Sequence, residues 1–289
     1  MTELETIEHR ASDAMTIVAD LRGPTDGRPI LFLHGGGQTR HSWAAGADKL
    51  AEAGFRTICM DFRGHGDSSW HPDGRYELTD HATDVLSLID TMNERPVLVG
   101  ASLGGIVGTV LEGAVRPGSI RGLALVDIVP RMNVAGADRI LAFMFERAEE
   151  GFGSLEEVAD AVAAYNPHRP RPSNLEGLKK NVRLRNGRWY WHWDPRAFSH
   201  AVGDVQTIDR PTVRSADRLA EALAGVSVPV VLIRGRQSDI VTDAEVADFR
   251  SEFPDAGYVD ISGAGHMVAG DQNDPFTRAV YDFVVSLAH

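Results

Sequence analysis

The sequence predicts an α/β protein with a largely parallel sheet, on two observations. Short β-branched runs alternate with amphipathic helical stretches along most of the chain, which is the order produced by strands joined through crossover helices. Most of these runs are continuously apolar, as expected of strands that are buried on both faces. The expected strands are residues 15–21, 30–33, 57–60, 97–99, 123–126, 228–233 and 258–261.

Helical patterns lie between these runs. Residues 78–92 carry apolar side chains at helical spacing, and Thr79 and Asp80 are placed to cap the start of this helix. This pattern predicts helices packed on a sheet.

The alternation is interrupted between residues 131 and 225. Helical patterns at 137–150 and 155–165 follow one another without a strand, and a proline-rich connector at 167–172 comes next. A helix at 215–223 leads back to the sheet. We therefore expect an α/β core formed by residues 1–130 and 226–289, with an inserted helical cap formed by residues 131–225.

The chain is acidic and has the composition of an ordinary globular protein. Its 289 residues include 29 Lys and Arg against 41 Asp and Glu, which gives a formal net charge of −12. No Lys/Arg-rich run is present, and neutralising nucleic-acid phosphates requires a basic face. Nucleic acid is therefore not an expected partner, and a small-molecule substrate is.

The sequence also bears on the location of the protein and on its need for disulfides, metals and cofactors. The first residues lack the regions of a secretory signal, and no apolar run approaches the roughly 20 residues of a membrane span. We expect a cytoplasmic protein that does not enter a membrane. Cys59 is the single cysteine, which excludes an intrachain disulfide and paired-cysteine zinc sites. The histidine spacings match no metal motif and no cofactor motif is present, so we expect neither.

The strand at 97–99 is followed by Gly-Ala-Ser-Leu-Gly at 100–104 and then by a helical pattern. A serine in this G-x-S-x-G spacing sits on a cramped turn that exposes its hydroxyl above the sheet, and small flanking residues avoid clashes with nearby backbone. The context predicts Ser102 as a nucleophile.

A serine hydroxyl needs a base to take its proton, and the base needs a carboxylate to orient it. His266 lies on a glycine-flanked loop after the last strand, and Asp239 follows the strand at 228–233. We therefore expect the triad Ser102, Asp239 and His266. Asp127, at the end of the strand 123–126, is the rival acid, because some hydrolases take their acid from that strand.

Acyl transfer also requires hydrogen-bond donors for the oxyanion. The strand 30–33 ends in His34 and three glycines, and backbone N–H groups in such a loop can donate without side chains in the way. Gly36 is the first choice for one donor and Leu103 for the other, with Gly35 or Gly37 as substitutes.

Together these segments resemble the α/β-hydrolase fold superfamily over nearly the whole length. The resemblance rests on the glycine loop 34–37, the Asp-Phe-Arg-Gly-His-Gly-Asp-Ser segment 61–68, the serine turn 100–105, Asp239 and His266. It implies that segment 61–68 is structural and borders the active site. It also implies an α/β-hydrolase fold with a catalytic triad, an oxyanion hole and a cap.

The serine turn separates subclasses within this resemblance. Epoxide hydrolases and haloalkane dehalogenases of the superfamily have aspartate at the position of Ser102, and carbon-carbon bond hydrolases usually have asparagine at that of Ala101. Esterases, lactonases and cofactor-free haloperoxidases remain, and we expect a serine hydrolase that cleaves a small to medium, largely uncharged ester or lactone. A perhydrolase, a carbon-carbon bond hydrolase and a small-molecule receptor with little turnover are the alternatives.

The predicted cap holds an aromatic cluster at 189–193 and apolar residues at 143–145. Such side chains can form an apolar pocket wall or pack the cap together. Trp191 and Phe143 are the residues we expect to bind substrate.

Overall fold

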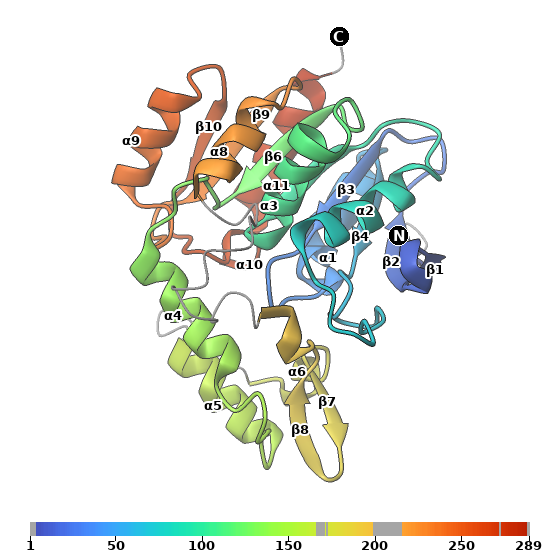
Figure 1. Ribbon diagram of the computed structural model, residues 1–289, viewed down its shortest axis with the longest axis vertical. Coiled ribbons are helices and arrows are strands. Elements are labelled where there is room, and N and C mark those ends of the chain that lie inside the picture. Colours follow the sequence, from blue (N-terminus) through green and yellow to red (C-terminus); the bar gives the residue numbers. More distant parts are fainter. Residues whose placement is uncertain (1–3, 166–170, 172, 199–215, 272, 288–289) are drawn as a thin grey trace.

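The computed structural model describes residues 4–165, 171, 173–198, 216–271 and 273–287. Eight strands form one twisted sheet (Figure 1), and pairing is parallel from β4 to β10 and antiparallel at β1 and β2. In sheet order the strands are β1 (Glu5–Arg10), β2 (Thr16–Arg22), β4 (Arg56–Met60), β3 (Pro29–Leu33), β5 (Val97–Ala101), β6 (Gly122–Val126), β9 (Val230–Gly235) and β10 (Gly257–Ile261).

Each of the seven expected runs forms one of these strands, with ends within two residues of the prediction. The α/β fold class is confirmed. The edge strand β1 was not predicted, because its residues are mostly exposed and carry no continuous apolar run.

Helices cover both faces of the sheet. Because side chains alternate along a strand, each face buries its own apolar cluster: α1 and α11 pack on one face, and α2, α3, α8 and α9 on the other. These helices are α1 (Ala44–Glu52), α2 (Leu78–Ile89), α3 (Leu103–Val110), α8 (Ala216–Ala224), α9 (Asp243–Glu252) and α11 (Asn273–Ser286); shorter ones are η1 (Ser12–Ala14), η2 (Arg40–Trp43), η3 (Leu111–Val115) and α10 (Val268–Asp271).

The start of α2 shows how local sequence sets a helix end. Glu77, rather than Thr79 or Asp80, is the N-cap residue, and Asp80 completes a capping box by accepting the Glu77 N–H at 3.0 Å. The helix ends at Ile89, three residues before the predicted end.

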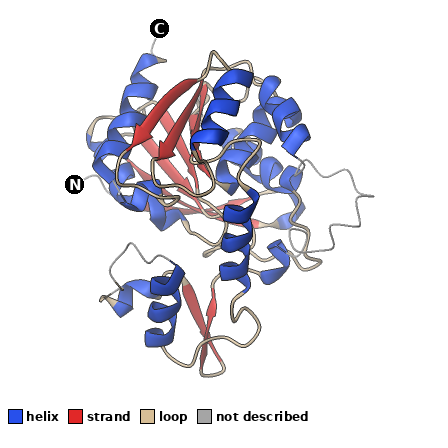
Figure 2. Ribbon diagram, turned by 90° about the vertical axis from the view of Figure 1, so that its left-hand side faces the viewer, coloured by secondary structure: helices blue, strands red, loops and turns tan. Residues whose placement is uncertain are grey.

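The inserted segment stands away from the sheet (Figures 1 and 2). Its described elements are α4 (Val134–Phe145), α5 (Leu155–Tyr165), α6 (Leu175–Leu178), β7 (Val182–Arg185), β8 (Arg188–Trp191) and η4 (Pro195–Phe198). They bury an apolar cluster of their own that includes Phe152, Trp191 and Trp193. We call residues 134–198 the cap. Most of the connector predicted at 167–172 lies outside the described residues.

The expectation of an all-helical cap is wrong, because β7 and β8 form an antiparallel hairpin. Its turn is Asn186-Gly187, where both residues have positive φ, 49° and 78°, as a two-residue hairpin turn requires. The predicted end of the cap at 225 also needs correction. Leu219 and Leu223 of α8 belong to the apolar cluster of the sheet, so α8 packs with the core.

Among the described residues, no helix is both long and apolar enough to cross a membrane.

Candidate active site

Ser102 occupies a strained turn between β5 and α3. Its backbone has φ 47° and ψ −114°, which is outside the usual regions for a residue with a side chain. A Cβ at Gly100 would lie 2.4 Å from the Gly104 backbone, and one at Gly104 would lie 2.2 Å from the Leu33 carbonyl O. The two glycines of the G-x-S-x-G pattern are therefore required for α3 to approach β3 and β5 so closely.

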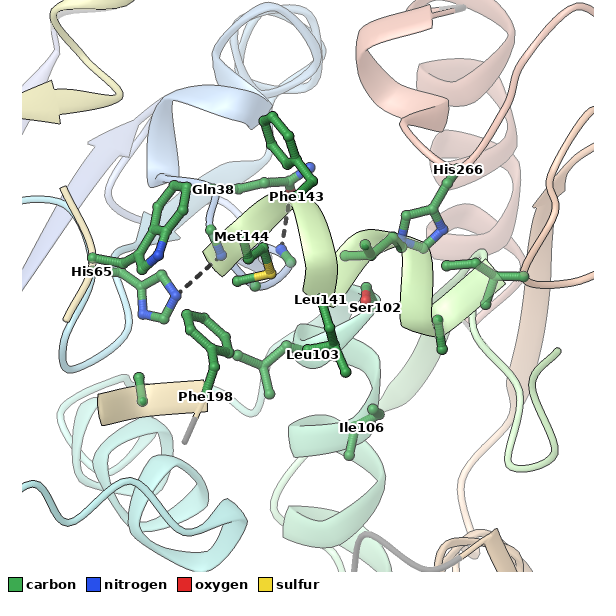
Figure 3. A pocket seen from close by; sticks show the side chains of 18 of the residues that line it. Gln38, His65, Ser102, Leu103, Ile106, Leu141, Phe143, Met144, Phe198 and His266 are labelled. Atoms are coloured by element: carbon green, nitrogen blue, oxygen red, sulfur yellow. Dashed lines mark hydrogen bonds between the residues drawn. The ribbon is translucent and has the colours of Figure 1, made fainter. Parts of the chain in front are cut away.

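His266 lies on the loop between β10 and α10 and faces the same cavity as Ser102 (Figure 3). Its Nδ1 donates a hydrogen bond to Asp127 Oδ2 at 2.7 Å. The Asp127 side chain is fully buried, whereas the His266 side chain is 13% exposed. Nε2 is therefore the ring nitrogen that remains for a reacting group.

Asp127 is held by a dense set of donors. Its Oδ1 accepts the Gly235 N–H at 3.0 Å, and its Oδ2 accepts the Ser238 hydroxyl at 2.5 Å in addition to His266. The residue has φ 51°, a conformation that aspartate tolerates better than most residues. This strained backbone position turns the carboxylate toward the histidine loop.

The prediction that Asp239 orients His266 is therefore wrong, and the rival Asp127 takes that place. The Asp239 side chain is 37% exposed and forms an ion pair with Arg139 of α4. Its neighbour Ser238 points inward and donates to Asp127. Asp239 instead joins the cap to the loop after β9.

The glycine loop after β3 has most of its backbone groups engaged. The Gly35 N–H donates to Gln38 Oε1 at 3.0 Å, and the Gly37 N–H donates to His65 Nε2 at 3.2 Å (Figure 3). No described residue accepts the N–H of Gly36. Among the three glycines, Gly36 is thus the one whose N–H is available, and its role as an oxyanion donor stays a prediction.

The N–H of Leu103 is the other group predicted as an oxyanion donor. Leu103 is the first residue of α3, and the first N–H groups of a helix have no intrahelical acceptor. A Cβ built on Gly35 would lie 3.4 Å from Ser102 Cβ, so the glycine loop borders the serine directly. Gly36 and Leu103 both line the cavity.

His34 and His65 support the glycine loop from the core side. His34 Nδ1 donates to the Gly35 carbonyl at 2.7 Å while its Nε2 accepts the Phe62 N–H at 3.1 Å. Both rings are fully buried. Burial is the largest cause that lowers the pKa of His34 to about 4 and that of His65 to about 3. Both are therefore neutral at pH 7, as their roles as hydrogen-bond acceptors require.

The cavity beside Ser102 has a volume of about 610 Å³ and lies between the sheet edge and the cap. None of its described lining residues is Asp, Glu, Lys or Arg. Most of the apolar members come from α3, α4, α5, β8, η4 and α8, whereas Trp193 and Ile240 lie on the loops after β8 and β9. The apolar members include Leu103, Ile106, Ile140, Leu141, Phe143, Met144, Val162, Trp191, Trp193, Phe198, Leu219 and Ile240.

Trp191 and Phe143 both line this cavity, as expected of substrate-binding residues. Trp191 also packs within the cap: its ring stacks on Trp193 with centroids 4.8 Å apart, and its Nε1 donates to the Glu146 carbonyl at 3.2 Å. Phe143 stacks on Tyr165 at 4.1 Å. The same side chains thus line the pocket and pack the cap together.

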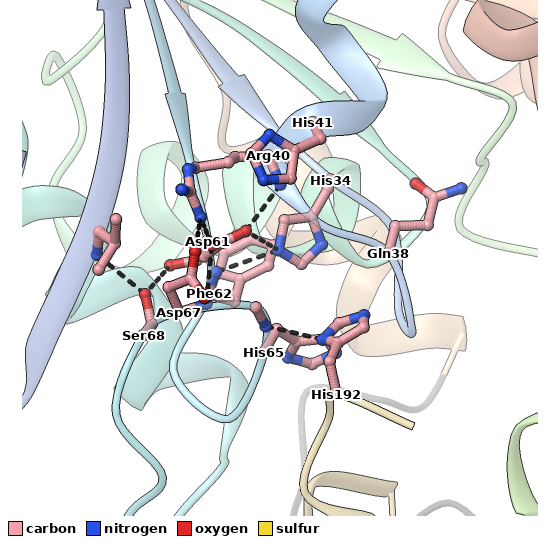
Figure 4. Close-up of polar contacts among 12 residues, drawn as sticks. His34, Gln38, Arg40, His41, Asp61, Phe62, His65, Asp67, Ser68 and His192 are labelled. Carbon is pink, nitrogen blue, oxygen red and sulfur yellow. Dashed lines mark hydrogen bonds and ion pairs between the residues drawn. The ribbon is translucent and has the colours of Figure 1, made fainter. Parts of the chain in front are cut away.

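Sequence reasoning missed Gln38 and His65 as residues of the site. His65 belongs to the segment 61–68, which the resemblance marked as structural and bordering the active site. The remainder of that segment is structural: Asp61 accepts the Arg40 N–H at 2.7 Å, and Ser68 Oγ donates to the Asp61 carbonyl at 2.7 Å (Figure 4).

Comparison with known proteins identifies the family of this chain. The family model described as the alpha/beta hydrolase fold matches residues 28–271. The chain belongs to the α/β hydrolase fold family and is an enzyme of that family.

Several known proteins are similar to this chain over most of its length. The esterase Rv0045c of Mycobacterium tuberculosis is 30% identical over 251 residues, covering 84% of this chain and 78% of the relative. A 3-hydroxybutyrate-oligomer hydrolase of Cupriavidus necator is 26% identical over 250 residues, covering 84% of each chain. The crystal structure of E-2-(acetamidomethylene)succinate hydrolase superposes with a TM-score of 0.81 at 23% identity, over 98% of this chain and 100% of that one; this likeness concerns the fold alone.

The buried neutral histidines predict an acid-sensitive fold. Their folded-state pKa values, about 4 for His34 and about 3 for His65, lie below the value of about 6.5 expected in the unfolded chain. Between these values the unfolded chain binds more protons than the folded chain. The free energy of unfolding should therefore fall as pH drops below 6.5, by at most about 1.4 kcal/mol per pH unit for each histidine.

Thermal unfolding at a series of pH values from 7 down toward 4, at constant ionic strength, measures this effect. His65→Gln removes one titrating ring and should show a shallower decline, even if it is less stable at pH 7. A parent protein with a constant melting temperature across this range would contradict the assignment of neutral, buried rings.

Proposed function

We propose that this protein is a serine hydrolase that cleaves small to medium, uncharged carboxylic esters or lactones through an acyl-enzyme intermediate on Ser102. The observation that carries the proposal is one cavity lined both by Ser102 on its strained turn and by a histidine that a buried carboxylate orients. The names of two relatives, an esterase and a hydrolase of hydroxybutyrate oligomers, support ester substrates.

In the proposed reaction His266 is the general base. Its Nδ1–H is engaged by Asp127, so Nε2 takes the proton of the Ser102 hydroxyl as the oxygen attacks the substrate carbonyl carbon. The buried Asp127 carboxylate stabilises the imidazolium that forms. His266 then gives this proton to the departing alcohol oxygen, and a water molecule activated in the same way hydrolyses the acyl-enzyme.

The carbonyl oxygen becomes an oxyanion in each tetrahedral intermediate. We assign its two donors to the N–H groups of Gly36 and Leu103, which border Ser102 from the glycine loop and from the start of α3. Leu103 has the further advantage of a helix N-terminus, where the helix dipole favours negative charge.

The cavity defines the substrate class. Its described lining holds no Lys or Arg that could pair with a substrate carboxylate, and no Asp or Glu that could pair with a cation. Burying an unpaired charge costs several kcal/mol. Uncharged substrates therefore fit the cavity, with Trp191 and Phe143 in contact with their apolar part.

Replacing the nucleophile tests the proposal. Ser102→Ala should lower kcat for a short p-nitrophenyl ester by a factor on the order of 10³ or more, because covalent catalysis is lost. The parent protein should react with a fluorophosphonate probe and the variant should not. The melting temperature of the variant serves as the folding control. Equal labelling of the two proteins would contradict the assignment of Ser102.

Substitutions of Asp127 and Asp239 form a matched pair that tests which carboxylate orients His266. Asp127→Asn should lower kcat by a factor on the order of 10⁴, because an amide no longer selects the histidine tautomer or stabilises the imidazolium. Asp239→Asn removes an ion pair with Arg139 and should keep kcat near the parent value. If Asp239→Asn were the more damaging of two folded variants, the acid would be Asp239.

A pair of esters tests the charge of the substrate. Ethyl levulinate and monoethyl succinate have nearly the same size, but only the second carries a carboxylate. We expect kcat/KM for ethyl levulinate to be higher by a factor of about 100 or more, because no Lys or Arg among the described lining residues can pair with the carboxylate. Titration of the released acid at constant pH measures both. Equal values would contradict the inference that the cavity selects uncharged substrates.

A further inference from the structure

His192 joins the cap to the glycine loop of the core. It follows β8 directly, and its ring is buried, with 1% of the residue exposed. Nδ1 accepts the Gly66 N–H at 2.7 Å and Nε2 donates to the Gly37 carbonyl at 3.3 Å. Both partners are backbone groups of the core, so one cap side chain bridges two separate core loops.

These two contacts require one tautomer. Nδ1 must be unprotonated to accept, and Nε2 must carry the proton to donate, so the ring is neutral. Burial, then the neighbouring His65 and His34, and then Arg183 hold the pKa of His192 well below its usual value. The protonation state that the hydrogen bonds require is therefore also the one that its surroundings favour.

Gly37 needs such support because three consecutive glycines leave the loop backbone free to rotate. The direction of the Gly36 N–H depends on the peptide groups around it. Because the peptide unit is planar with its oxygen and hydrogen on opposite sides, the Gly35 carbonyl, held by His34, directs the Gly36 N–H away from the core. On the other side of Gly36, the Gly37 N–H is held by His65 and the Gly37 carbonyl by His192.

We propose that His192 is a positioning residue that makes the geometry of the oxyanion loop depend on the docking of the cap hairpin. The inference rests on the proposed function, in which Gly36 donates to the oxyanion. His34 and His65 come from the core and hold the loop whatever the cap does. His192 comes from the cap, so the loop has its full set of contacts only when the hairpin lies against Gly66 and Gly37.

Arg183 of β7 provides a contrast within the same hairpin. Its Nη2 donates to the Gly66 carbonyl at 3.0 Å and to Asp67 Oδ1 at 2.7 Å. It therefore docks the hairpin on the same core turn as His192, but its described contacts do not include the glycine loop. Arg183→Gln therefore weakens docking without removing a contact to the glycine loop.

Two substitutions of His192 separate its two hydrogen bonds. The Gln amide nitrogen reaches the position of His Nε2, so His192→Gln keeps the donor to Gly37. The Asn amide oxygen reaches the position of His Nδ1, so His192→Asn keeps the acceptor for Gly66 and loses the contact with Gly37. The full-length protein with either substitution is compared with the parent and with Arg183→Gln.

We expect His192→Asn to lower kcat for ethyl levulinate by about 10- to 100-fold with little change in KM, because a displaced oxyanion donor acts in the transition state; complete loss of one donor costs about 10²- to 10³-fold. His192→Gln should retain most of kcat, and Arg183→Gln should retain it as well. Thermal melting of all three variants measures the effect on stability separately.

A second readout distinguishes loop geometry from general damage. Trifluoromethyl hexyl ketone forms an adduct with a catalytic serine that carries an oxyanion, whereas methyl hexyl ketone binds without one. The inhibition constant of the first should rise in His192→Asn by the factor by which kcat falls, and that of the second should not change.

Equal losses of kcat in His192→Asn, His192→Gln and Arg183→Gln would overturn the inference, since docking alone would then explain the effect. The same holds if both ketones weaken equally. Turnover by the parent that disappears in Ser102→Ala shows that the proposed function stands in either case. A parent without Ser102-dependent turnover overturns the proposed function and this inference with it.

Discussion

The close approach of α3 to the ends of β3 and β5 is the constraint on which the site depends. Gly104 lies so near the Leu33 carbonyl that a Cβ would come within 2.2 Å of it. The approach places Ser102 beside the glycine loop that follows β3. Because β3, β5, β6 and β9 run parallel, the loops after their ends meet at one edge, where Asp127 also lies. The two apolar clusters that hold the sheet between its helices offset the energetic cost of the strained backbone at Ser102.

The sequence was sufficient for the features that local rules determine. Continuous apolar runs predicted the core strands, and the small residues around Ser102 and at 35–37 predicted a cramped turn at Ser102 and a glycine loop beside it. The choice between Asp127 and Asp239 depends on contacts across the sheet instead. Both follow neighbouring parallel strands, β6 and β9, and the outcome is set by Ser238 and the Gly235 N–H, which engage Asp127, and by Arg139, which engages Asp239.

The contacts that hold the glycine loop could not be predicted from spacing. His65 lies 28 positions from Gly37 in the sequence, and His192 of the cap lies 155 positions away. The pairing of β7 with β8 brings His192 to the core, and the Asn186-Gly187 turn was the one local signal for that hairpin. The histidine count gave no indication of these roles, because each ring acts through backbone groups.

Neutral histidines suit this position for an electrostatic reason. An aspartate near the glycine loop would oppose the developing oxyanion, and a lysine or arginine could donate to Gly37 O but could not accept the Gly37 or Gly66 N–H. A neutral imidazole donates at one nitrogen and accepts at the other, so His192 can bridge Gly66 and Gly37 without adding charge to the cavity. The cost of this arrangement is the burial of imidazole rings that would be protonated in water below about pH 6.5. Neutral histidines add no charge to the cavity. The contacts that they make with the glycine loop therefore depend on their remaining neutral, and so does the stability of the fold.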